Sequence, residues 1–277
     1  MHTPHSPQRY VELFSETYRG RIEAVARGDQ NVLIGALDYV DKDHPETGIT
    51  GELYRYSQFD SDEPWFNIRN REEASEEEIK QIRIPENLKP HFSRFPFVFL
   101  PKGHRLYIEI RKYGKVSSPH ALATAFRRLF ADERLGNFGP VEVTAEPQRD
   151  ALKLLFQIPF IRTLTIEIVR PNPDDGGVLQ RRFMKKLEDQ NASTMEIKLS
   201  ASRDERLIPD DDTKAIAGVA ASNGYVRASG RNMDGLAITR STRDIPLIER
   251  ATYDSDIQSS NDALLQTAMR LHTSFTP

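Results

Sequence analysis

Residues 95–130 read FPFVFLPKGHRLYIEIRKYGKVSSPHALATAFRRLF, and residues 141–172 read VEVTAEPQRDALKLLFQIPFIRTLTIEIVRPN. Apolar and polar residues alternate over 104–114 and again over 163–171, which is typical of antiparallel strands with one wetted side. Ser118 and Pro119 predict the start of a helix between these strands, because a serine hydroxyl caps free amides and a first-turn proline needs none. We expect strand, helix, strand, helix and strand, as in a ferredoxin-like or split βαβ unit.

The chain on either side of this block supplies further strands and helices. Residues 30–40 are strongly apolar and residues 51–59 are rich in aromatic residues, and together they predict a hairpin. Downstream we expect a helix at 178–190, a strand at 195–202, a helix at 213–224 and a hairpin at 225–242. The predicted fold class is α+β with two lobes: an arm or helix at 1–24, a mixed antiparallel sheet with the split βαβ unit over 25–172, and a smaller α+β lobe over 173–277.

Composition restricts the class of protein. The 277 residues include no cysteine, which excludes disulfides, thiolate zinc sites and a cysteine nucleophile. No run of about 18 apolar residues occurs, and the polar N-terminus lacks the apolar segment of a signal peptide. The histidines show no i, i+4 pairing for zinc, and no glycine-rich phosphate loop is present. We expect a cytoplasmic protein with no membrane insertion, no metal and no cofactor.

Charge is unevenly distributed along the chain. The formal net charge is −3, yet residues 101–130 hold seven lysines or arginines against one acid, Glu109. Residues 41–90, in contrast, hold 13 acids against seven bases. Clustered cations bind nucleic acid by releasing counterions from its phosphates, without sequence preference. Tyr107 and Tyr113 lie among these cations, where tyrosines can stack on exposed bases.

The predicted nucleic-acid contacts fall into two blocks. One lies on the expected strand hairpin and the helix that follows it, and the other on one side of the helix at 178–190. The candidate residues are Lys102, Arg105, Arg111, Lys112, Lys115, Arg127, Arg128, Arg181, Arg182, Lys185 and Lys186. The competing interpretation is an ordinary solvated surface whose cations are balanced by nearby acids.

A metal-dependent nuclease is the enzymatic alternative. Asp174 follows Pro173, and Glu196 and Lys198 lie 22 and 24 positions further on, in an expected strand. Two carboxylates can hold Mg²⁺ while a lysine supports the attacking water, and many nucleases use a Glu-x-Lys sequence in this way. Against this alternative, Asp174 lies in a Pro- and Gly-rich turn, and a basic helix separates it from Glu196.

The block FPFVFLPKGHRLYIEIRKYG, the helix after it, and the strands VEVTAEP and TLTIEIVRP resemble the Rex exclusion protein A family of lambda-like phages and its bacterial relatives. The resemblance covers roughly residues 30–172 and includes the upstream segments GELYRYSQFD and ASEEEIKQI. It implies a cytoplasmic, non-enzymatic DNA-binding protein that forms a homodimer. Such a protein would sense phage DNA in an abortive-infection system and signal to a separate effector in the membrane or to an effector nuclease.

Three functions therefore follow from the sequence. The first is a DNA-binding sensor of phage infection that captures duplex DNA electrostatically and has no catalytic residues. The second is the Mg²⁺-dependent nuclease built on Asp174, Glu196 and Lys198. The third is an RNA-binding subunit of a larger assembly, which would prefer single-stranded RNA to duplex DNA.

Overall fold

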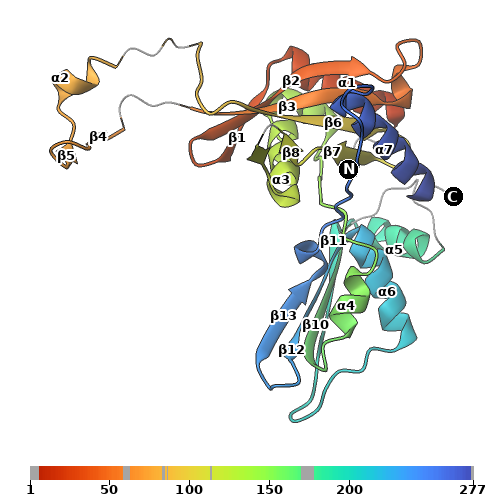
Figure 1. Cartoon of the computed structure of the whole chain (residues 1–277). Helices are drawn as coiled ribbons and strands as arrows, with labels where there is room; N and C mark the ends of the chain where they lie inside the picture. The colour runs from red at the N-terminus through yellow and green to blue at the C-terminus, as the bar shows by residue number, and fades with distance from the viewer. Residues whose placement is uncertain are drawn as a thin grey trace.

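The structure is a computed structural model that describes residues 6–58, 63–82, 85, 87–112, 114–169 and 178–275. Helices and antiparallel sheets combine in it as the α+β class predicts. Two sheets form the two halves of the molecule, one above the other in Figure 1. Among the described residues, no helix is both long enough and apolar enough to cross a bilayer.

The first sheet has five strands in the order β1-β2-β3-β6-β7, each antiparallel to its neighbours. The strands are β1 (Glu23–Arg27), β2 (Gln30–Tyr39), β3 (Ile49–Ser57), β6 (Ser93–Leu100) and β7 (Arg105–Ile108). The predicted hairpin of β2 and β3 is confirmed, with a short helical turn at Pro45–Thr47 between them. Alternate residues of β6 therefore point to opposite faces of this sheet.

Two helices bury one face of the first sheet. They are α1 (Pro7–Arg19) and α3 (Pro119–Phe130), and a further helical turn follows at Glu133–Phe138. Each helix begins at a serine, Ser6 or Ser118, whose hydroxyl accepts a hydrogen bond from a first-turn amide and is followed by proline. Phe97 and Phe126 meet in the core between them, with ring centroids 5.3 Å apart.

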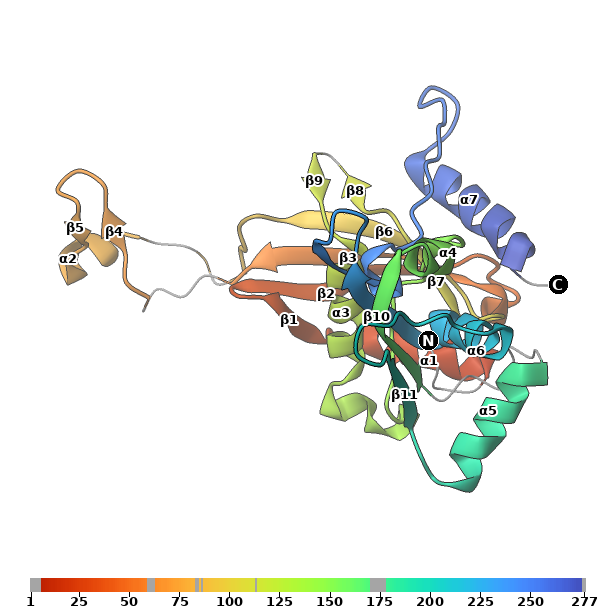
Figure 2. The same cartoon turned by 90° about the horizontal axis from the view of Figure 1, so that it is seen from below.

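The last helix, α7 (Ser260–Phe275), covers the other face of the same sheet. Val98 and Leu100, which alternate with the core phenylalanines of β6, are buried together with Ala268 of α7. Figures 1 and 2 show α7 lying beside β6 and β7. The C-terminal end of the chain thus returns to the first sheet instead of remaining in a C-terminal lobe.

Docking of α7 should depend on pH through His272. The pKa of His272 is lowered from its ordinary value of 6.5, first by burial and then by the nearby charges of Arg105 and Lys102. Docking therefore has its full stability above this ordinary value. As the pH falls below it, the undocked helix takes up a proton that the docked helix resists, and docking weakens.

We expect proteolytic removal of α7 to accelerate between about pH 7.5 and about pH 5.5, the range in which an unperturbed histidine takes up its proton. His272→Gln should show a shallower pH dependence, because it cannot take up this proton. Equal pH dependence in the two proteins would show that His272 does not control docking.

A small acidic arm projects from the first sheet. It spans residues 63–82 and contains β4 (Phe66–Asn67), β5 (Glu72–Glu73) and α2 (Glu76–Ile79). The predicted capping box is confirmed, because Ser75 and Glu78 each bond the backbone amide of the other. Both views show the arm standing away from the two sheets (Figures 1 and 2), and Phe66 and Ile68 are 68% and 80% exposed.

The second sheet has four strands in the order β11-β10-β12-β13, all antiparallel to their neighbours. The strands are β10 (Phe160–Val169), β11 (Thr194–Ser200), β12 (Gly224–Arg231) and β13 (Ala237–Ser241). Three helices cover one face (Figure 1): α4 (Ala151–Phe156), α5 (Val178–Asp189) and α6 (Asp211–Ser222). Strands β11 and β12 are parallel, joined by α6, and β10 lies between them, which is a split βαβ arrangement.

The split βαβ arrangement therefore lies further along the chain than the sequence predicts. Residues 141–145 carry no strand, although VEVTAEP was expected to form one. Strand β10, expected in the first lobe, belongs to the second sheet, so the change of sheet falls before β10 and not at residue 172. Helix α3 ends at Phe130, and Gly136 lies inside the following helical turn instead of ending α3.

Candidate nucleic-acid interface

The predicted wetted side of the strand at 104–114 is largely covered. Arg105 forms an ion pair with Glu146 at 3.0 Å, and its side chain is only 21% exposed. Tyr107 packs against Val98 and Leu100 under α7, and burial raises its pKa to about 12. Both side chains therefore take part in the docking of α7 and of the segment around Glu146, and their contact with nucleic acid stays a prediction.

The two arginines of α3 are also held by protein partners. Arg127 donates to the carbonyl of Val143 at 2.9 Å and lies 3.4 Å from a carboxylate oxygen of Glu142. Arg128 donates to the carbonyls of Val25 and Ala26 of β1, at 2.7 and 2.9 Å. These carbonyls lie on an outer strand, so Arg128 occupies an edge that another strand could otherwise pair with. These contacts occupy part of the donor capacity of both arginines, and their role in binding nucleic acid stays a prediction.

The remaining predicted cations whose side chains the structure describes are exposed but divided between the two halves. Lys102, Arg111 and Lys115 lie next to the first sheet, where β8 (Arg111–Lys112) and β9 (Lys115–Val116) form a short hairpin. The side chain of Lys112 and all of Tyr113 lie outside the described residues. Four cations lie on α5 of the second half: Arg181, Arg182, Lys185 and Lys186. Figures 1 and 2 show α5 and the hairpin apart, so the two blocks do not form one groove.

Glu196 and Lys198 lie on the exposed side of β11, whereas Asp174 falls outside the described residues. The partner of Glu196 on β10 is Glu167. The amide of Ala201 donates to the carbonyl of Arg162, so these two opposed residues form a hydrogen-bonded pair. Hydrogen-bonded and non-hydrogen-bonded pairs alternate along the two strands, which makes Glu167 and Glu196 a non-hydrogen-bonded pair. In such pairs the Cα atoms are about 4.5 Å apart and the side chains are close. Two like charges therefore face each other across the strands.

Arg243 balances one of these two carboxylates. It lies in the helical turn Thr242–Asp244 after β13, and its guanidinium is 3.4 Å from a carboxylate oxygen of Glu167. The same guanidinium stacks over the ring of Tyr225, 4.1 Å from the centroid, and Arg227 lies 5.6 Å from that centroid. An aromatic ring is therefore flanked by two arginines, and the Arg243 side chain is still 47% exposed.

These residues share one face of the second sheet, which we call the open face. Strand register places on it Thr163, Thr165, Glu167, Glu196, Lys198, Tyr225, Arg227, Ser229 and Thr239. The helices α4, α5 and α6 pack on the opposite face, against residues such as Leu164 and Ile166. The open face thus offers an aromatic ring, cations and hydroxyl groups on a flat support.

Sequence reasoning found Glu196 and Lys198 but missed Glu167, Tyr225, Arg227 and Arg243. Only the alternation of polar residues marked the strands that carry them. Alternation gives the face of each strand but not its neighbour, so the grouping required the strand register. Among the described residues, no group of three or more acidic or histidine side chains is placed to hold a metal ion.

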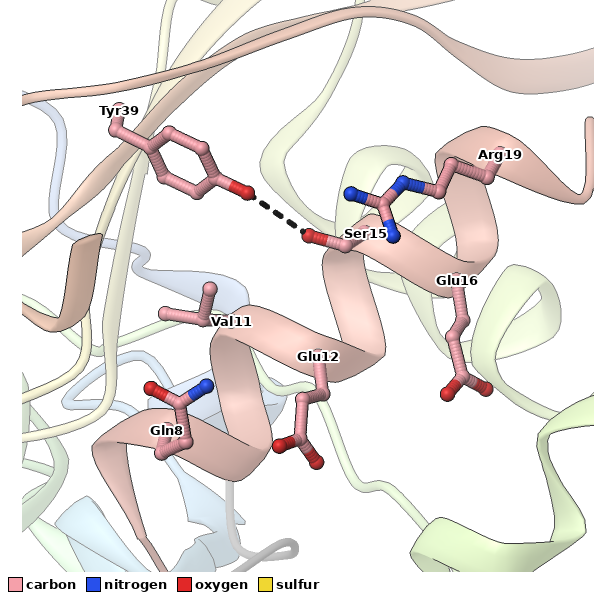
Figure 3. A pocket seen from close by; sticks show the side chains of 7 residues that line it. All are labelled: Gln8, Val11, Glu12, Ser15, Glu16, Arg19 and Tyr39. Carbon is pink, nitrogen blue, oxygen red and sulfur yellow. Dashed lines mark hydrogen bonds between the residues drawn. The ribbon is translucent and has the colours of Figure 1, made fainter. Parts of the chain in front are cut away.

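A shallow hollow beside α1 offers no comparable chemistry. It measures about 200 Å³ and is lined by Gln8, Val11, Glu12, Ser15, Glu16, Arg19 and Tyr39. Figure 3 shows the Ser15 hydroxyl directed at the Tyr39 hydroxyl, 3.3 Å away. The hydrogen-bond partner of this serine is a phenol and not a histidine or carboxylate base, so the pair is not the arrangement that activates a serine nucleophile.

A protein-family model described as a domain of unknown function (DUF4747) matches residues 1–269. The match includes both sheets and most of α7, so the two halves belong to one family unit. No curated protein and no solved structure matches the chain.

Proposed function

We propose that this chain, which belongs to the DUF4747 family, binds a single-stranded nucleic acid on the open face of its second sheet. The observation that carries the proposal is the Tyr225 ring, which is flanked by Arg243 and Arg227 on a sheet whose helices α4, α5 and α6 pack on the other face. Bases stack on aromatic rings and on guanidinium planes, and this stacking tolerates any base sequence.

Phosphates have partners on the same face. Arg227 and Lys198 lie on strands that flank β10, and Thr165 of β10 is the register partner of both. Arginine, lysine and hydroxyl side chains are the usual donors to phosphate oxygens. With Arg243 as a third cation, about three phosphates would be neutralised, so log Kd should change with log salt by a slope of about 2.

A single strand suits this face better than the duplex DNA expected from the sequence. Duplex capture without base contacts needs cations along an extended surface. Arg105, Arg127 and Arg128 are held by protein partners instead, and the exposed cations are divided between the two halves. The sensor role in phage exclusion, with its separate effector, stays a prediction of the resemblance.

The test is a salt titration of fluorescence anisotropy with labelled single-stranded DNA, single-stranded RNA and duplex DNA. We expect the single strands to bind more tightly than the duplex, and Tyr225→Ala to weaken their binding about tenfold through lost stacking. Tyr225→Phe should bind like the wild type. Arg227→Ala should weaken binding and lower the salt slope by about 0.7.

Lys214→Ala is the matched control, because it removes one exposed cation from α6 on the helix side of the sheet. Its binding should equal that of the wild type. Wild-type protein that binds none of the three polymers at low salt would refute the proposal. Binding that survives Tyr225→Ala and Arg227→Ala but is lost when Lys185 and Lys186 become glutamate would move the interface to α5.

A Mg²⁺-dependent nuclease is retained as a second candidate because Glu167 directly opposes Glu196, with Lys198 two residues further along. Glu167 would then take the role that the sequence suggested for Asp174. The ion pair of Glu167 with Arg243 competes with a metal for that carboxylate, which is why we favour binding. The same titration with added Mg²⁺ decides the matter: cleavage that Glu196→Gln abolishes would establish the nuclease.

A further inference from the structure

Strand β11 is an outer strand of the second sheet, and within the part of the chain that the structure describes no strand pairs with its far side. It pairs with β10 along its whole length, without a bulge. The hydrogen-bond pattern between β11 and β10 also determines which backbone groups of β11 point away from β10. Since Ala201 bonds to Arg162, the residues 195, 197 and 199 bond to β10, and the amides and carbonyls of 194, 196, 198 and 200 point outward.

The side chains of β11 read the same in both directions by chemical type. Around Ile197, Glu196 and Lys198 have opposite charges, Met195 and Leu199 are both apolar, and Thr194 and Ser200 both carry a hydroxyl. An antiparallel copy of the strand centred on Ile197 would therefore match every residue with a suitable partner. Opposite-charge and apolar pairs are the combinations that stabilise neighbouring strands.

The backbone permits the same register. Centring on Ile197 sets residue 196 opposite 198 and residue 194 opposite 200, and all four of these have outward-pointing amides and carbonyls. Directly opposed residues of this kind exchange both hydrogen bonds in an antiparallel pair. Moving the register by two residues in either direction also preserves hydrogen bonding, but it sets Glu196 opposite its own copy, or Lys198 opposite its own copy. Charge therefore selects the centred register.

The environment of Glu196 adds an independent argument. Glu167 faces it from β10 and is itself balanced by Arg243. Within the described part of the chain, neither Glu196 nor Lys198 has an ion-pair partner. Strand β1, by contrast, has its edge occupied by the guanidinium of Arg128. Among the described residues, no backbone or side-chain hydrogen bond covers the outer edge of β11 in this way, and the strand itself has no proline and no bulge. Such features are what keep outer strands from pairing.

We propose that two copies of this chain pair antiparallel through β11, centred on Ile197, with Glu196 of each copy opposite Lys198 of the other. The pairing joins two four-stranded sheets into one continuous sheet about a two-fold axis. Each cross-strand pair then occurs twice, except the pair of Ile197 with its own copy on the axis. The axis passes through the sheet, so both sets of helices stay on one side and both open faces lie together on the other.

The test is a charge swap followed by analytical ultracentrifugation over a dilution series. Lys198→Glu sets the new carboxylate of each copy opposite Glu196 of the other copy, once on each side of the axis. Glu196→Lys likewise sets two amines opposite each other on each side of the axis. Each single variant should weaken the dimer at least about tenfold relative to the wild type. The double variant Glu196→Lys, Lys198→Glu restores opposite charges and should dimerise like the wild type.

Mixing the two single variants gives a sharper result. Each is expected to be mainly monomeric alone, but one presents carboxylates where the other presents amines, so the mixture should form heterodimers. Misfolded variants could not recover in this way. Wild-type protein that remains monomeric throughout the dilution series would overturn the proposal. A dimer that persists in both single variants would also overturn it, because the contact would then lie elsewhere.

Discussion

Replacing Phe14 with alanine is expected to lower the free energy of unfolding by about 3–5 kcal/mol. Phe14 is fully buried on α1 and lies between the first sheet and α3. Its ring stacks on Phe99 with centroids 4.9 Å apart and meets Phe130 edge-on at 5.2 Å. Alanine would remove the apolar contacts and leave a cavity that the rigid aromatic neighbours cannot fill.

Phe66→Ala is the matched control for this prediction. It removes the same ring from the exposed arm, where we expect a change within about 0.5 kcal/mol. Urea unfolding should be followed by circular dichroism, because the single tryptophan, Trp65, lies in the arm and reports neither core. Equal losses for the two variants would show that Phe14 does not occupy a packed core.

Local signals in the sequence were sufficient to predict several helix starts and hairpins. The start of α3 at Ser118 and the capping box at Ser75 and Glu78 form as predicted. A helix cap depends on residues only three positions apart, so the sequence contains all the partners. The hairpins were predictable for the same reason, because their strands are neighbours in the chain.

The predictions from sequence failed where a residue's partner lies far away in the chain. Arg128 looks like a solvated cation in the sequence, yet it binds the carbonyl of Val25, 103 positions away. No residue near Arg128 in the chain indicates that contact. The strand at 160–169 was recognised from its alternation, but its neighbours β11 and β12 come later in the chain. Alternation shows that a strand has two different faces and leaves its sheet undetermined.

The candidate site was predictable only in part, for the same physical reason. Glu196 and Lys198 are two residues apart on one strand, so their shared face follows from a strand period of two. The grouping of Tyr225 with Arg243 and Glu167 joins three separate segments through sheet register. No spacing rule connects such segments.

The close approach of β12 to β10 makes Gly230 a position where a single added methyl group should be strongly destabilising. A Cβ at Gly230 would overlap the carbonyl oxygen of Phe160 and lie 2.8 Å from its carbonyl carbon. Both are backbone atoms of the neighbouring strand, beside the register shift between Ile161 and Thr163, so no side chain can rotate away. Gly230→Ala should therefore separate the two central strands and cost about 3 kcal/mol, near the upper end for overpacking.

Gly218→Ala makes the same chemical change with the opposite expected sign. Gly218 is exposed inside α6, and a Cβ there would meet nothing within 4 Å. Alanine in a helix interior restricts the unfolded chain and should raise the free energy of unfolding by about 0.5–1 kcal/mol. The comparison isolates the approach of Phe160 as the cause of the loss at Gly230. If urea unfolding gave Gly230→Ala the stability of the wild type, the two central strands of the second sheet would have to be further apart than the structure places them, and the grouping of Tyr225 with Glu167 would change with them.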